Sequence, residues 1–130
     1  MRILLVDDEQ GFLAIMRDVL HDAGHEVVLA EDGKVARELL ASEKIDLIVS
    51  DVFMPTLDGA RFHSFVREFT QNADIPFIFI SGVDDSRTRT LIVDPERDFF
   101  FSKTTPVEII LKQIDKFRKA DSSKSGQHNQ

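Results

Sequence analysis

Short apolar runs alternate along this chain with longer segments in which apolar residues recur every three or four positions. The runs have the length of buried β-strands, and the longer segments have the period of amphipathic helices. Alternation of the two is typical of an α/β domain in which helices cover both faces of a parallel sheet. The predicted strands lie at residues 3–6, 26–30, 46–50, 75–80 and 98–101.

Five helices are predicted between and after these strands, around residues 12–20, 33–42, 62–69, 84–93 and 107–119. Asp32 is expected to cap the second helix, and Gly24 to end the first in a left-handed conformation. Thr105, Pro106 and Glu108 form a capping box with proline at the first position of the last helix. Right-handed crossovers with strand order 2-1-3-4-5 then give a single doubly wound, five-stranded parallel sheet.

Composition narrows the possible functions. The 130 residues support one domain, and the formal net charge of −7 argues against a nucleic-acid or anionic-membrane surface. The chain has no cysteine, which excludes disulfides and thiolate chemistry. No apolar run approaches the roughly 20 residues of a membrane span. We therefore expect a soluble, cytoplasmic protein whose partners are other proteins.

Polar side chains follow four of the predicted strands. Asp7 and Asp8 follow the first, Asp51 the third and Ser81 the fourth, and Lys103 comes shortly after the fifth. In a parallel sheet these ends share one edge, so all five side chains are expected there. Three carboxylates in one place repel each other unless a cation lies among them, and Mg²⁺ prefers such oxygen ligands. The sequence therefore predicts a metal-dependent site that handles phosphoryl groups.

Four motifs stand at these strand ends: Asp7-Asp8; Asp51-Val52-Phe53-Met54-Pro55 with Leu57-Asp58-Gly59; Ser81-Gly82; and Lys103. In this order they resemble the receiver domain of response regulators, the phosphoacceptor module of two-component signalling and of chemotaxis regulators. The resemblance covers residues 1–119 and implies a flavodoxin-like fold. Residues 120–130 have nothing to bury and are expected to form a disordered tail.

The resemblance implies a role for each residue of the site. Asp51 accepts a phosphoryl group from a phosphohistidine of a sensor histidine kinase or a histidine phosphotransfer protein. Asp8, the Asp51 carboxylate and the Phe53 carbonyl bind Mg²⁺, with Asp7 acting through a water molecule. Lys103 pairs with the carboxylate before the reaction and with a phosphoryl oxygen after it.

The same resemblance implies how phosphorylation changes the surface. Ser81 moves toward the new phosphoryl group, and Phe100 fills the space behind it. The fourth helix, fifth strand and fifth helix then form the face that a partner binds. We expect a single-domain regulator that docks onto another protein or passes its phosphoryl group onward in a phosphorelay. Phosphorylation-dependent homodimerisation is left open.

Two departures from the family pattern affect these expectations. Two threonines precede Pro106, where the family has proline directly after the lysine, so we expect a trans peptide after Lys103. Phe53 and Val83 are apolar at positions that flank the path of attacking water in the family. We therefore expect the aspartyl phosphate to be long-lived for a receiver domain.

Two other functions are left open. An aspartate-nucleophile phosphatase also uses a carboxylate at a strand end, but it usually has a second Asp two residues later, where this chain has Phe53. A constitutive binding module would keep the site without using phosphorylation. The four histidines show no metal-ligand spacing, and we expect all of them at the surface or in loops: His21, His25, His63 and His128.

Overall fold

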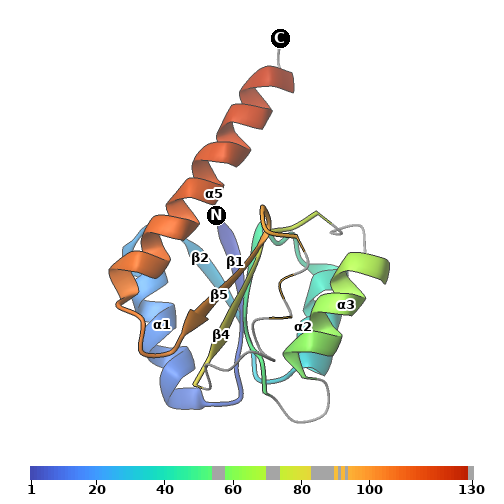
Figure 1. Cartoon of the computed structure of the whole chain (residues 1–130), viewed down its shortest axis with the longest axis vertical. Coiled ribbons are helices and arrows are strands. Elements are labelled where there is room, and N and C mark those ends of the chain that lie inside the picture. The colour runs from blue at the N-terminus through green and yellow to red at the C-terminus, as the bar shows by residue number, and fades with distance from the viewer. Residues whose placement is uncertain (54–57, 70–73, 83–89, 91, 93, 129–130) are drawn as a thin grey trace.

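A five-stranded parallel sheet forms the centre of the molecule (Figure 1). The computed structural model describes residues 1–53, 58–69, 74–82, 90, 92 and 94–128. The strand order is β2-β1-β3-β4-β5, which confirms the predicted doubly wound, flavodoxin-like topology. The strands are β1 (Arg2–Val6), β2 (Glu26–Ala30), β3 (Leu47–Asp51), β4 (Phe77–Ser81) and β5 (Asp98–Ser102).

Helices cover both faces of the sheet. In the described part of the chain they are α1 (Gln10–Asp22), α2 (Gly33–Ser42), α3 (Gly59–Phe69) and α5 (Val107–His128). Asp32 caps α2 by accepting a 2.9 Å hydrogen bond from the Val35 N–H, and Gly24 follows α1 with a φ of 92°, both as predicted. No helix among the described residues is long and apolar enough to cross a bilayer.

Alternate side chains of each strand enter two separate apolar layers. Leu4 and Val6 of β1 face the layer with α2 and α3, whereas Ile3 and Leu5 face the layer with α1 and α5 (Figure 1). All four side chains are fully buried. Each contributes about 1.5–3 kcal/mol relative to an exposed position, so the two layers hold the sheet rigidly in place.

The strand register brings the carboxyl ends of the strands to one edge. Val6 lies opposite Ser50, so Asp7 and Asp51 both come one residue later on neighbouring strands. Ser81 lies opposite Ser102, which places Lys103 directly beyond that pair. Asp51 and Ser81 are themselves the last residues of β3 and β4, one residue further along than we predicted for those strands.

The last two predicted helices need separate comment. The fourth, at residues 84–93, falls mostly outside the described residues and stays a prediction. We expected the last to end near residue 119, before a disordered tail at 120–130, whereas α5 continues to His128. No proline interrupts residues 107–128, so the backbone amides can keep donating to carbonyls four residues earlier. The prediction of a disordered tail rested only on the lack of apolar side chains that could be buried there. The domain boundary at residue 119 stays a prediction.

Candidate functional site

Three carboxylates meet at the carboxyl edge of β1 and β3. One oxygen from each of Asp7, Asp8 and Asp51 lies within 4.8 Å of the other two. The Asp7 side chain is fully buried and Asp51 is 7% exposed, while Asp8 is open to solvent. Buried acids in contact are rare unless a cation or strong hydrogen bonds compensate them, so this cluster is the first candidate for chemistry.

Backbone hydrogen bonds and close packing fix the conformation of the chain around Asp51. The Val52 N–H donates a 2.8 Å hydrogen bond to Asp51 Oδ1, and the Gly59 N–H donates a 2.8 Å bond to the Val52 carbonyl. A Cβ atom on Gly59 would lie 2.2 Å from the Asp51 carbonyl oxygen, so only glycine allows α3 to begin this close to β3. Gly59 therefore fixes the backbone that carries the Asp51 carboxylate.

Lys103 supplies the positive charge. Its Nζ lies 3.0 Å from Asp7 Oδ2, 3.1 Å from Glu9 Oε2 and 3.7 Å from Asp51 Oδ2. The Lys103 N–H also donates a 2.8 Å bond to the Ser81 carbonyl, which joins the loop after β5 to the end of β4. The structure thus brings four of the predicted site residues into contact range at one edge.

The electrostatics of the cluster show that one lysine does not neutralise it. Burial and the neighbouring Asp7 charge raise the pKa of Asp51 to about 6, and Lys103 offsets only part of this rise. Burial likewise raises the pKa of Asp7. Burial alone would lower the pKa of Lys103, but hydrogen bonds to Asp7 and Glu9 and the Asp51 charge outweigh it and raise that pKa. The site therefore favours an additional cation.

A divalent metal ion fits this arrangement. The buried Asp7 Oδ2 lies 3.0 Å from Lys103 Nζ, a cation that Asp7 shares with Glu9 and Asp51. Carboxylates that share a single lysine repel each other unless a further cation joins them, and Mg²⁺ takes carboxylate and water oxygens. The acidic triad could hold such an ion. The Phe53 carbonyl, which we predicted as a further ligand, stays a prediction.

Comparison with known proteins agrees with this geometry. Residues 3–115 match the response regulator receiver domain family. The chain belongs to that family. The receiver domain is 33% identical over 113 residues to the response regulator MprA of Mycolicibacterium vanbaalenii, covering 87% of this chain and 48% of that protein. It is 31% identical over 102 residues to the regulatory protein PhoP of Bacillus subtilis, covering 78% of this chain and 42% of that protein. It spans about half the length of such curated relatives.

Solved structures share the fold. The chemotaxis protein CheY4 of Vibrio cholerae superposes with a TM-score of 0.81 at 27% identity, covering 89% of this chain and 97% of that one. The response regulator TrrA of Thermotoga maritima, solved in complex with Mg²⁺ and BeF, gives 0.79 at 24% identity, covering 89% and 97%. The second likeness concerns the fold alone.

The remaining predicted residues of the receiver domain have these positions. Ser81 is fully buried at the end of β4. Phe100 of β5 lies opposite Phe79 in the register and packs, half-buried, against the layer with α2 and α3. Val83 lies outside the described residues. The described part of the chain contains no cis peptide, so the Lys103–Thr104 bond is trans, as we expected.

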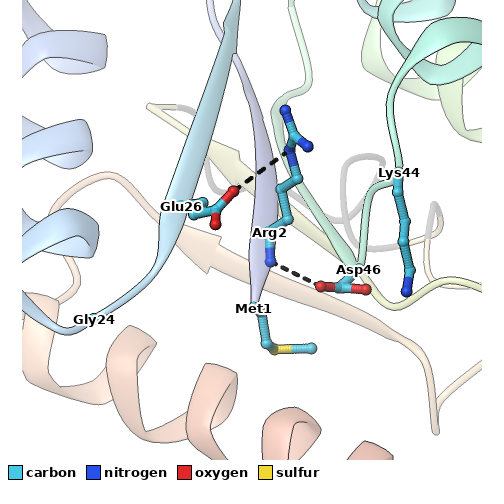
Figure 2. A pocket seen from close by; sticks show the side chains of 6 residues that line it. All are labelled: Met1, Arg2, Gly24, Glu26, Lys44 and Asp46. Atoms are coloured by element: carbon cyan, nitrogen blue, oxygen red, sulfur yellow. Dashed lines mark hydrogen bonds and ion pairs between the residues drawn. The ribbon is translucent and has the colours of Figure 1, made fainter.

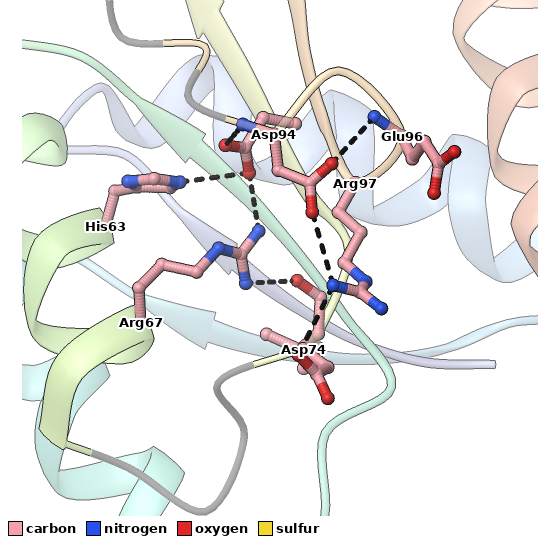
Figure 3. Close-up of polar contacts among 8 residues, drawn as sticks. His63, Arg67, Asp74, Asp94, Glu96 and Arg97 are labelled. Atoms are coloured by element: carbon pink, nitrogen blue, oxygen red, sulfur yellow. Dashed lines mark hydrogen bonds and ion pairs between the residues drawn. The ribbon is translucent and has the colours of Figure 1, made fainter.

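A second buried charge cluster was not predicted. Asp98, the first residue of β5, is almost fully buried, with His63 Nε2 at 2.9 Å from Oδ1 and the Arg67 guanidinium bonded to the same oxygen (Figure 3). Arg67 also donates to the Ile75 carbonyl at 2.6 Å. Our expectation that His63 lies at the surface was wrong, because α3 turns this residue inward against Phe77. His25 lies in the loop between α1 and β2, in agreement with the prediction, and is buried beside the N-terminal amine.

The cluster lies at the amino end of β5, away from the acidic triad at the carboxyl edge. Burial alone would raise the pKa of Asp98, but bonds from His63, the Asp94 N–H and Arg67 outweigh it and hold that pKa well below its usual range. Arg97 continues the network to Asp94 at 3.2 Å and Asp74 at 3.3 Å (Figure 3). Its charges are compensated, which indicates a structural role in the receiver domain.

A hollow of about 320 Å³ opens at the amino edge of β1 and β2 (Figure 2). It is lined by Met1, Arg2, Gly24, Glu26, Lys44 and Asp46. The Arg2 N–H donates a 2.8 Å bond to Asp46, and the Arg2 guanidinium lies 3.8 Å from Glu26. These contacts are ordinary structural ones and bring no group of carboxylates together, so we assign the chemistry of the receiver domain to the acidic triad.

Proposed function

We propose that this receiver domain accepts a phosphoryl group on Asp51 and that the modification changes how the domain binds a partner protein. The donor is a phosphohistidine of a sensor histidine kinase or of a histidine phosphotransfer protein in the cytoplasm. The observation that carries the proposal is the acidic triad at the carboxyl edge of the sheet, in which Asp7 and Asp51 are buried beside one lysine. Membership of the receiver family supports it.

In the proposed reaction, an Asp51 carboxylate oxygen forms a bond to phosphorus as the N–P bond of the phosphohistidine breaks. The imidazole leaves with the electron pair of that bond and is protonated to its neutral form. With a pKa near 6, Asp51 is largely ionised at pH 7 and is ready to act as the nucleophile. The backbone bond from Val52 keeps its carboxylate oriented.

Positive charge must gather around the transferred group because its oxygens become more negative. Lys103 Nζ, 3.7 Å from Asp51 Oδ2, is the residue of this chain that provides it. When bound by Asp7, Asp8 and Asp51 with the Phe53 carbonyl, Mg²⁺ would supply further positive charge at the same oxygens. The buried Asp7 carboxylate, which shares Lys103 with Asp51, supports this ligand set.

The output we propose begins at Ser81 and Phe100. Ser81 ends β4, the strand next to β3, and Phe100 lies in the middle of β5, on the other side of β4. The Ser81 hydroxyl donates a hydrogen bond to the new phosphoryl group, and Phe100 moves inward behind it. The surface formed by β5, α5 and the predicted fourth helix then changes, and a partner protein can recognise this change. A local change of charge acts at a distance only through an element that has two stable conformations.

A protein is the expected partner at the site. Two large apolar side chains close to the carboxyl edge are exposed: Phe53 is 56% exposed and Ile109, in the first turn of α5, is 48% exposed. A phosphodonor or target protein can cover both.

Phe53 and Val83 would also leave attacking water poorly placed. Faster hydrolysis in Phe53→Asn and Val83→Glu variants would support this view, whereas unchanged or slower decay would contradict it.

Intact-mass measurement tests the central proposal. We expect the wild-type protein to gain one phosphate mass with acetyl phosphate and Mg²⁺, and Asp51→Asn to gain none. No mass gain in the wild type would overturn the proposal.

Turnover of a generic phosphomonoester would instead favour a phosphatase. Partner affinity that is the same with and without phosphorylation would favour a constitutive binding module, and size-exclusion chromatography of both forms tests homodimerisation.

A further inference from the structure

Glu9 is a third acidic partner of Lys103. Its Oε2 lies 3.1 Å from Lys103 Nζ, as near as Asp7 at 3.0 Å and nearer than Asp51 at 3.7 Å. The lysine therefore rests nearer to Asp7 and Glu9 than to the proposed phosphoacceptor. The Glu9 side chain is 64% exposed, whereas that of Lys103 is only 18% exposed, so Glu9 is the solvent-facing partner of this ion pair.

The backbone explains why Glu9 points to this position. Glu9 precedes α1 at the N-cap position, and its N–H donates a 2.8 Å bond to Asp7 Oδ1. A side chain at the N-cap usually accepts from the free N–H groups of its own helix, but the Glu9 carboxylate makes no such bond. It bonds Lys103 instead, 94 residues further along the chain. The Phe12 ring, 4.7 Å from Nζ, supports the lysine from α1.

We propose that Glu9 is a positioning residue that holds Lys103 in a resting position, and that an incoming phosphoryl group must compete with Glu9 for this lysine. The inference rests on the function proposed above for Asp51. In the test reaction, an Asp51 oxygen forms a bond to phosphorus while the P–O bond of acetyl phosphate breaks, and acetate leaves with the electron pair. Lys103 can stabilise the transferring oxygens only after it loosens its contact with Glu9.

Removing the Glu9 charge should therefore speed the reaction. Loss of a largely exposed ion pair changes a rate by about two- to fivefold, because such pairs are weak and partly screened. We expect Glu9→Gln to raise the initial phosphorylation rate by that factor in an intact-mass time course with acetyl phosphate and saturating Mg²⁺. Glu9→Ala, which also removes the oxygen that can accept a hydrogen bond, should be at least as fast.

Glu26→Gln is the matched control. It removes the same charge from an exposed glutamate, and that glutamate pairs at 3.8 Å with Arg2 at the opposite edge of the sheet. We expect its rate to equal that of the wild type. If both glutamate variants accelerate the reaction equally, only the net charge of the protein matters and the proposal is wrong. A Glu9→Gln rate equal to or below the wild-type rate also overturns it.

Two further readouts separate positioning of Lys103 from repulsion of the anionic donor. In a Lys103→Ala background, Glu9→Gln should give no acceleration, and an acceleration of the same size there would contradict the proposal. Without metal or donor, Lys103 should react about two- to fivefold faster with an amine-acylating reagent in Glu9→Gln than in the wild type, followed by peptide mass spectrometry. Unchanged labelling would refute the resting contact even if Asp51 were never phosphorylated.

Discussion

Replacing Asp98 by asparagine should destabilise the fold more than any surface change. The Asp98 side chain is fully buried and its Oδ1 faces both His63 Nε2 and the Arg67 guanidinium. Its Oδ2 accepts a 3.0 Å bond from the Asp94 N–H. Asparagine keeps the shape but removes the charge, so the guanidinium of Arg67, which is 17% exposed, loses its buried counter-ion.

Breaking a buried ion pair by removing one partner costs about 3–5 kcal/mol, because the remaining charge stays desolvated. A domain of this size has a total unfolding free energy of about 5–15 kcal/mol. Asp98→Asn should therefore remove a large fraction of it. With an m-value of about 2 kcal/mol per molar urea, the unfolding midpoint should fall by roughly 1.5–2.5 M.

Urea unfolding followed by far-UV circular dichroism measures this shift. Asp115→Asn is the matched control, since Asp115 pairs with Arg118 and Lys119 on the exposed side of α5. Its midpoint should stay close to that of the wild type. If the midpoint of Asp98→Asn falls no further than that of the control, the cluster does not stabilise the fold and the reasoning is refuted.

The effect of Asp98 also depends on pH in a defined direction. Its pKa in the folded protein lies below the value near 3.9 of an unfolded chain. Its stabilising contribution is therefore complete above that unfolded value and is lost as the pH falls toward the folded pKa. The difference in unfolding free energy between wild type and Asp98→Asn should shrink as the pH falls below about 4. A difference that grows on acidification would contradict this sign.

Three further changes test single contacts. Gly59→Ala should destabilise the domain by about 1–3 kcal/mol in urea unfolding, since the new Cβ would lie 2.2 Å from the Asp51 carbonyl oxygen. Asp32→Ala should cost about 0.5–2 kcal/mol through loss of the bond from Val35, with an unchanged phosphorylation rate as its check. Asp7→Asn should weaken Mg²⁺ binding at least about tenfold in calorimetric titration, whereas unchanged affinity would exclude Asp7 from the metal site.

The sheet and its acidic edge could be predicted from the sequence because both depend on short-range patterns. Four of the five apolar runs are followed within two residues by the polar residues of the site. Parallel strands share one edge, so the strand ends alone place Asp7, Asp51 and Lys103 together. The observed strand ends differ from the predicted ones by about one residue. The polar residue at the end of a strand can still pair with the neighbouring strand, as Asp51 does with Ile80.

The Asp98 cluster could not be predicted in the same way. Asp98 precedes three phenylalanines, a pattern that equally describes an exposed strand start. Its partners His63 and Arg67 lie on α3, four residues apart and therefore on one face, which was the available signal. Whether that face turns toward the start of β5 depends on how α3 packs on the sheet. The contact between Glu9 and Lys103 could not be predicted for the same reason, because these residues are far apart in the sequence and meet only through the fold.

The two buried aspartate clusters differ in how completely their charge is compensated. Asp98 has donors for both oxygens, and its pKa is lowered. Asp51 has fewer compensating charges than acidic neighbours, and its pKa is raised to about 6. Compensated buried charge stabilises a fold, whereas uncompensated charge reduces stability and persists where a ligand completes it. This contrast is the reason for assigning function to the carboxyl edge. It also predicts that Mg²⁺ should raise the unfolding midpoint of the wild type but have a smaller effect on Asp51→Asn, whereas equal shifts would oppose a metal site at this edge.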